Sequence, residues 1–348
     1  MSKTLISLDR KNRDSNFELA RIVAMMMIVI GHFVVHGIWQ TEFCSRSDLQ
    51  NPLACTLENL IYSFCVCGVN IFVLISGYYK IKLKLKSFLS LWFLCAFYGI
   101  IATVVNLHDD ASFLPELIKS LFISNSQWFF KSYLWLLILS PVLNAGMDSM
   151  SLVSLRRFVL ILFVLNCFSG WVLNNANVNG YNVLQLIFIY VIGQWLSREP
   201  FINRFSPSQY FMGFVLISCL VCVCAVSSLL FLYDSNYGFY HYNNPLIVLG
   251  SIAIFCGFSQ LNVQSNTVNV IASTVVAALF IQDFIASRWI YESVYEASNN
   301  GIISLVLCCA AWLVLIFLSS FIVENIRQRL CQPLISRLEG FIKSFSRK

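Results

Sequence analysis

The chain has 348 residues, of which 58% are hydrophobic and only 11% charged, and its formal net charge is +6. A soluble globular protein carries about 25% charged residues, so this composition excludes an ordinary soluble domain and predicts a protein embedded in a lipid bilayer. The positive charge lies mainly in short loops between apolar segments, which indicates membrane topology and not a nucleic-acid-binding surface.

Apolar segments suited to crossing a membrane follow one another along the whole chain. A spanning helix takes about 20 mostly apolar residues, and the candidates lie at 18–39, 59–79, 87–106, 127–146, 157–174, 180–197, 209–233, 243–260, 268–290 and 301–323. Backbone groups inside lipid must bond within their own segment, so we expect an all-α polytopic bundle of about ten transmembrane helices. No Gly-, Ser- or Pro-rich linker divides them, so we expect a single membrane domain over 1–348.

The basic residues of the loops alternate in a way that predicts orientation. Lysine and arginine precede the first segment and gather after the second, fourth, sixth and tenth, whereas the loops at 40–58 and 107–126 are poor in them. Cytoplasmic loops carry the excess of basic residues. Both termini are therefore expected in the cytoplasm, with 1–16 as one tail and 324–348 as an amphipathic helix on the cytoplasmic surface.

The loops on the side opposite to the two tails have two further features. Residues 112–123 have the pattern of a second short amphipathic helix, on the side opposite to the tails. Cys44 and Cys55 share the first outward loop, so they can pair in an oxidising compartment, and the sequence leaves this disulfide open.

The first apolar segment, FELARIVAMMMIVIGHFVVHG, carries ionisable residues where lipid is expected. Arg21 and His32 are about 16 Å apart along a helix and within about 20° of the same face, and His36 follows one turn later. An ionisable residue inside a membrane is costly and indicates a function by default. The structural alternatives are a neutral His32 bonded to a nearby carbonyl and an Arg21 paired with Glu18.

This segment resembles the start of the membrane-bound acyltransferase-3 family, which acylates carbohydrates and has an acidic residue, an arginine and, after ten more residues, a histidine. Glu18, Arg21 and His32 match that pattern. Further stretches resemble the family in the same order, namely NIFVLISGYYKIK, QWFFKSYLWLLILSPVLN and GYNVLQLIFIYVIGQWL, whereas ALFIQDF has Gln282 where relatives often carry a histidine. The resemblance covers most of residues 15–295 and is to the short members that modify capsule, O-antigen or other exopolysaccharide sugars.

The resemblance implies an O-acyltransferase, expected to be an O-acetyltransferase, in the inner membrane of a bacterial cell. Acetyl-CoA or another acyl-CoA would be a co-substrate, with no permanently bound cofactor and no metal. The acceptor would be a hydroxyl of a cell-surface polysaccharide sugar or of its lipid-linked precursor. His32 would be the general base that takes the hydroxyl proton, with Arg21 and Glu18 completing the catalytic motif.

Other residues are assigned to the two substrates. For the acyl-CoA donor they are Arg21, Lys80, Lys82, Lys84, Ser76 and Gly77; for the acceptor they are His36, Trp128, Tyr133 and Asp283. Each has a structural alternative: the lysines as topology charges, Gly77 as a helix-packing position, the aromatic rings as an interfacial belt, and Asp283 as the partner of Lys131 or Arg288. The alternative function is a transporter or flippase with His32, His36 and Asp283 as a proton relay.

Overall fold

The computed structural model describes residues 14–40, 51–107, 110, 112–122, 128–231 and 236–345, and all regular structure within them is helical. In this part of the chain nine helical stretches are long and apolar enough to cross a membrane. Their bounds are Ser15–Ile38, Pro52–Tyr78, Leu85–Leu107, Trp128–Ser149, Leu152–Val172, Pro207–Phe231, Gly238–Ser259, Asn266–Ile285 and Ile302–Ile342. The all-α polytopic fold is confirmed. The remaining expected span, 180–197, is the shorter apolar helix α9 (Val183–Leu196).

Most of these stretches consist of more than one element. The α-helices are α2 (Ser15–His32), α3 (Pro52–Cys65), α4 (Gly68–Tyr78), α5 (Leu85–Leu107), α6 (Phe113–Leu121), α7 (Trp128–Ser149), α8 (Leu152–Leu165), α9, α10 (Pro207–Phe231), α11 (Pro245–Ser259), α12 (Asn266–Ala272), α13 (Val276–Phe280), α14 (Ser287–Asn299) and α15 (Ile302–Phe345). The π-helices are η1 (Phe33–Ile38), η3 (Asn166–Val172) and η7 (Ile281–Ile285); the 3-10 helices are η4 (Val178–Gly180), η5 (Pro200–Arg204) and η6 (Asn236–Tyr240).

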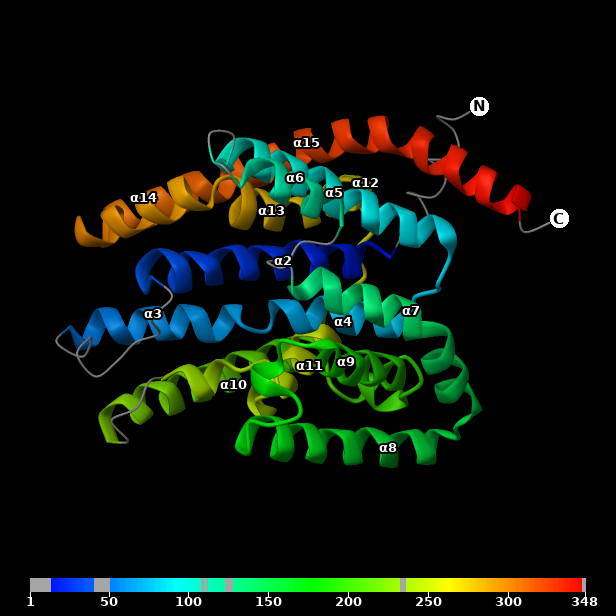
Figure 1. The fold of residues 1–348 in the computed structure, drawn as a ribbon. Coiled ribbons are helices and arrows are strands. Elements are labelled where there is room, and N and C mark those ends of the chain that lie inside the picture. Colours follow the sequence, from blue (N-terminus) through cyan, green and yellow to red (C-terminus); the bar gives the residue numbers. More distant parts are fainter. Residues whose placement is uncertain are drawn as a thin grey trace.

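The long helices run side by side, and α2 lies in the middle of the bundle, between the α5, α13 and α15 group and the α3 and α4 pair (Figure 1). Helix α2 begins and α15 ends at the same end of the bundle (Figure 1). We call this end, which also holds Lys80 between α4 and α5, the lysine end. The expectation that both termini lie in the cytoplasm is consistent with this arrangement, although which membrane face it meets stays a prediction.

Helix α9 is short but lies deep in the bundle, where glycines let it approach α4. A Cβ atom on Gly77 would lie 2.2 Å from the backbone oxygen of Tyr190, and one on Gly193 would lie 2.4 Å from that of Leu74. Small residues at such a crossing allow close backbone packing between membrane helices. The contact supports the packing alternative for Gly77.

Two segments differ from their predicted placement. Helix α6 forms where a short helix was expected, but it folds back along α5: the indole nitrogen of Trp92 donates to the backbone oxygen of Leu121 at 2.9 Å. Helix α15 is 44 residues long, about 66 Å, and runs from Ile302 to Phe345. It therefore continues without a break from its apolar part into the predicted tail that begins at residue 324. Glu324 and Arg327 form a buried ion pair within that helix. Cys55 is buried, and Cys44, the other cysteine of that loop, lies outside the described residues.

Candidate active site

Two interruptions of regular α-helix meet near the middle of the bundle. Helix α2 changes to the π-helix η1 immediately after His32, and α13 changes to the π-helix η7, which contains Asp283. Single π-helical turns within α-helices are frequent at functional sites, and the extra residue turns side chains out of their regular register. Here the two turns bring His32 and Asp283 face to face.

A cavity of about 420 Å³ lies between these two turns and the helices α3, α4 and α7. Seven of the lining side chains carry a polar nitrogen or oxygen atom: His32, His36, Tyr62, Trp128, Tyr181, Tyr242 and Asp283. The rest is apolar: Met25, Ile28, Val35, Val69, Phe72, Phe129, Phe130, Val276, Leu279 and Phe284. A mostly apolar pocket with a few convergent polar groups is the usual form of a small-molecule site.

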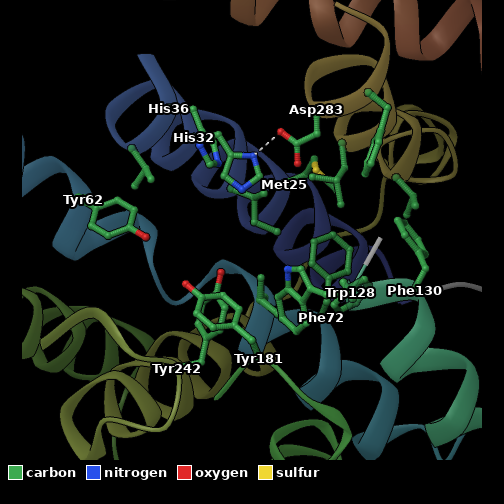
Figure 2. Close-up of a pocket in the computed structure, with 17 residues that line it drawn as sticks. Met25, His32, His36, Tyr62, Phe72, Trp128, Phe130, Tyr181, Tyr242 and Asp283 are labelled. Carbon is green, nitrogen blue, oxygen red and sulfur yellow. Dashed lines mark ion pairs between the residues drawn. The ribbon is translucent and has the colours of Figure 1, made fainter. Parts of the chain in front are cut away.

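The central polar contact of the cavity joins His32 and Asp283. The Nδ1 atom of His32 lies 3.0 Å from Oδ1 of Asp283, and both side chains are about four-fifths buried. The hydroxyl of Tyr291 donates to the same carboxylate oxygen at 2.6 Å. The other ring nitrogen of His32 faces the side of the cavity where Trp128 and Tyr242 lie (Figure 2). A carboxylate on Nδ1 that leaves Nε2 facing a substrate space is the arrangement of an oriented general base.

His36 extends this cluster towards α14. Its ring lies 5.2 Å from that of His32 and 5.2 Å from that of Tyr291. Asp283 contacts His32 and Tyr291, whereas Arg288, one of the two partners considered for it, donates to Glu292 at 3.1 Å. The physical reason is that the π-helical turn η7 directs Asp283 towards α2, while Arg288 belongs to the next helix, α14.

The wall opposite His32 is aromatic. Trp128 stacks on Tyr242 with ring centres 5.8 Å apart, and Tyr181 meets both rings edge-on at 5.0 Å and 4.9 Å. The hydroxyls of Tyr181 and Tyr242 point into the cavity, as does that of Tyr62 (Figure 2). We call Trp128, Tyr181 and Tyr242 the aromatic wall.

The remaining predicted residues lie towards the lysine end, away from the cavity lining. Arg21 donates to the buried carboxylate of Glu18 at 2.6 Å and keeps 32% of its side chain exposed. The hydroxyls of Ser76 and Tyr133 are 3.0 Å apart. Lys80 is paired with Asp148. Lys82 and Lys84 are exposed in the loop before α5.

The structure thus separates the predicted residues into two groups. His32, His36, Trp128 and Asp283 line one cavity, whereas Arg21, Glu18, Ser76, Gly77, Tyr133 and the lysines lie nearer the lysine end. Sequence reasoning missed Tyr62, Tyr181 and Tyr242. The available signal was that Tyr181 and Tyr242 lie in polar, asparagine-rich stretches, NNANVNGY and HYNN, between apolar segments.

A polytopic helical bundle with a histidine–carboxylate pair on an internal cavity belongs to the membrane-embedded enzymes or to the proton-coupled transporters. Comparison with known families decides between these classes. The family model described as an acyltransferase domain, that of the acyltransferase-3 family, matches residues 14–272. The chain therefore belongs to this family of membrane acyltransferases. No curated protein and no solved structure matches it.

Proposed function

We propose that the protein transfers an acyl group, preferably acetyl, from acyl-CoA to a hydroxyl of a cell-surface polysaccharide sugar or of its lipid-linked precursor. The observation that carries this proposal is the His32–Asp283 contact of 3.0 Å at the wall of the cavity. It supplies a base in a site closed enough to hold a sugar hydroxyl next to a thioester.

The reaction needs one proton carrier, and His32 suits both halves of it. Its free ring nitrogen takes the proton from the acceptor hydroxyl while the hydroxyl oxygen attacks the thioester carbonyl carbon. The carbon–sulfur bond then breaks, and the imidazolium returns the proton to the departing CoA thiolate. Asp283 keeps the proton of His32 on Nδ1 and stabilises the imidazolium, as the carboxylate of a catalytic triad does.

The lysine end suits the donor. CoA is anionic at its nucleotide phosphates, and Arg21 lies on α2 between this end and His32. A guanidinium binds phosphate through two parallel hydrogen bonds, and about a third of the Arg21 side chain stays accessible beside Glu18. The exposed Lys82 and Lys84 would add long-range attraction, and the pantetheine arm would reach the cavity about 16 Å further along α2.

The acceptor is placed on the other side of His32. Trp128 offers a flat apolar face, His36 offers a polar edge, and both line the cavity. Aromatic faces of this kind bind the apolar face of a sugar ring, while nearby polar groups fix its hydroxyls. Acyl groups would thus pass from a CoA ester on the cytoplasmic side to a sugar reached from the opposite side.

The direct test uses purified protein, acetyl-CoA labelled in its acetyl group, and surface polysaccharide extracted from cells that make the protein and then de-O-acylated with mild alkali. We expect label to enter the polysaccharide with the wild-type protein and not with His32→Ala. Absence of transfer by the wild-type protein would contradict the proposal.

Orientation has its own test by cysteine labelling in intact cells, in a variant without reactive native cysteines. A cysteine at Lys84 should be protected from a membrane-impermeant reagent, and one at Ala176 should react. Ala176 is chosen because it is exposed in the segment before Val178, whereas its neighbour Asn177 is only 4% exposed. The reverse pattern would exchange the donor and acceptor sides.

The transporter alternative uses the same cluster, since His32, His36 and Asp283 do lie together. Such a relay would move protons with a solute and leave acetyl-CoA unchanged. Consumption of acetyl-CoA that depends on added polysaccharide would therefore exclude it, and family membership favours the enzyme.

A further inference from the structure

Four buried amide side chains stand behind the aromatic wall. Asn70 is 1% exposed, Gln185 1%, Asn177 4% and Asn243 0%. They come from α4, the start of α9 and the two segments that carry Tyr181 and Tyr242. We call them the amide clamp. Burying an amide costs free energy unless it is hydrogen-bonded, so a cluster of four within a membrane bundle calls for an explanation.

Gln185 is the centre of the clamp. Its Nε2 donates to the backbone oxygen of Tyr242 at 2.8 Å and to the side-chain oxygen of Asn70 at 3.3 Å. Its Oε1 accepts from Nδ2 of Asn177 at 3.0 Å. One side chain therefore ties the Tyr242 backbone to α4 and to the segment that leads to Tyr181.

The two tyrosine-bearing segments are also joined to each other directly. The backbone nitrogen of Tyr242 donates to the oxygen of Asn179 at 3.1 Å, and Nδ2 of Asn243 donates to the backbone oxygen of Asn177 at 2.6 Å. Gly180, immediately before Tyr181, has φ +78°, and a Cβ atom there would lie 2.8 Å from Cβ of Tyr242. Only glycine fits that conformation and that contact without strain.

The result of these contacts is the position of two rings. Tyr181 and Tyr242 meet edge to face at 4.9 Å, both contact Trp128, and both direct their hydroxyls into the cavity below His32 (Figure 2). These contacts hold the backbone around both rings and so fix hydroxyl groups within the cavity, which is what recognition of a polyhydroxylated ring demands.

We propose that Tyr181 and Tyr242 are the acceptor-binding residues that contact the hydroxyl groups of the sugar, and that Gln185 is the residue that positions them. This inference rests on the proposed function and names its acceptor subsite. Trp128 then provides the ring face, the two tyrosines provide hydrogen bonds, and the sugar hydroxyl to be acylated lies towards His32. The clamp acts on the acceptor and leaves donor binding untouched, because its contacts lie at the opposite end of α9 from the lysine end.

The test compares two glutamines of the same helix. Gln185→Leu breaks the clamp, whereas Gln194→Leu removes an equally buried glutamine that donates to Asn144 near the lysine end. The assay measures transfer from labelled acetyl-CoA to the de-O-acylated polysaccharide, with KM determined for each. We expect Gln185→Leu to raise the polysaccharide KM about tenfold and to leave the acetyl-CoA KM within about twofold, while Gln194→Leu leaves the polysaccharide KM unchanged.

A second pair of variants keeps the proposal testable if Gln185→Leu fails to fold. Tyr242→Phe preserves the ring and backbone but removes the hydroxyl, and we expect it to raise the polysaccharide KM about fivefold. Tyr190→Phe is the matched control, because its hydroxyl donates to Asn144 outside the cavity.

An unchanged polysaccharide KM in Tyr242→Phe, or an equal rise in the two control variants, would overturn the inference. In that case transfer by the wild-type protein and its loss in His32→Ala would leave the proposed function standing. If the wild-type protein itself transfers no label to the polysaccharide, the proposed function falls and the inference falls with it.

Discussion

The first spanning segment takes part in two acid–base pairs, one near its start and one deep in the bundle, and the pairs are built differently. Glu18 and Arg21 are three residues apart on one face of α2, so helical geometry alone brings them together. His32 and Asp283 come from opposite ends of the chain and meet only because two π-helical turns face each other. The first pair is a local feature, and the second is a product of the whole fold. In our proposal the local pair holds the donor, and the long-range pair performs the chemistry.

The largest effect is expected from removing the base. His32→Ala should lower kcat about a thousandfold, since general base catalysis contributes about 10²–10⁴. The measurement is label transfer from acetyl-CoA, with size-exclusion chromatography in detergent as the control for folding. Added imidazole should restore part of the activity by filling the space of the lost ring. Transfer at a near-normal rate would remove His32 from the mechanism.

The next effect is expected from the carboxylate. Asp283→Asn keeps the size of the side chain but no longer stabilises the imidazolium, so kcat should fall about a hundredfold with little change in either KM. Glu292→Gln is the control, because it removes a carboxylate from the exposed Arg288–Glu292 pair on the neighbouring helix.

The combination of both changes decides whether the pair acts as one unit. His32→Ala with Asp283→Asn should be no slower than His32→Ala alone, because residues that act together are not additive. A further hundredfold loss in the double variant would mean that Asp283 acts independently of His32 and that the two residues do not form one catalytic unit.

The same contrast shows what the sequence can predict. The spans follow from apolar runs of sufficient length, and His32 follows from an imidazole deep within such a run. The neighbours of Asp283 do not follow, because Arg288 is close along the chain and His32 is far, and only packing reverses that order. The family match ends at residue 272, so it does not reach Asp283 either.

The aromatic wall could not be predicted from the sequence for a related reason. Tyr181 and Tyr242 lie at the ends of apolar runs, where aromatic residues of an interfacial belt also occur. Their place in the cavity depends on Gly180 and Gln185, which are close in the sequence, and on Asn70 from a distant helix, and the contacts of these residues appear only in the folded chain. Periodicity and spacing predict helices well, but they do not predict which polar side chains meet between helices.

A smaller effect is expected at the local pair. Arg21→Ala should raise the acetyl-CoA KM about tenfold with kcat nearly unchanged, and Arg21→Lys should restore only part of the loss, since an ammonium cannot bind phosphate through two parallel hydrogen bonds. Arg156→Ala is the matched control. Arg156 lies on α8 and, like Arg21, is paired with a buried glutamate, here Glu199. An unchanged acetyl-CoA KM in Arg21→Ala would assign the pair to structure alone.

The smallest effect is expected from the exposed lysines of the loop before α5. Lys82→Ala combined with Lys84→Ala should raise the acetyl-CoA KM about threefold at low salt, because an exposed charge contributes only about 0.2–1 kcal/mol. The effect should disappear near 1 M salt, where the screening length falls to about 3 Å. Lys119→Ala removes an exposed lysine from α6 and should change nothing.

The donor analogue S-acetyl-pantetheine sharpens the test, since it keeps the thioester but lacks the nucleotide phosphates. Its KM should be insensitive to these lysines and to Arg21, yet its acetyl group should still require His32 and Asp283. If the lysine variant lost affinity for this analogue as well, the lysines would act through the loop and not through phosphate, and the donor would have to enter the cavity by another path.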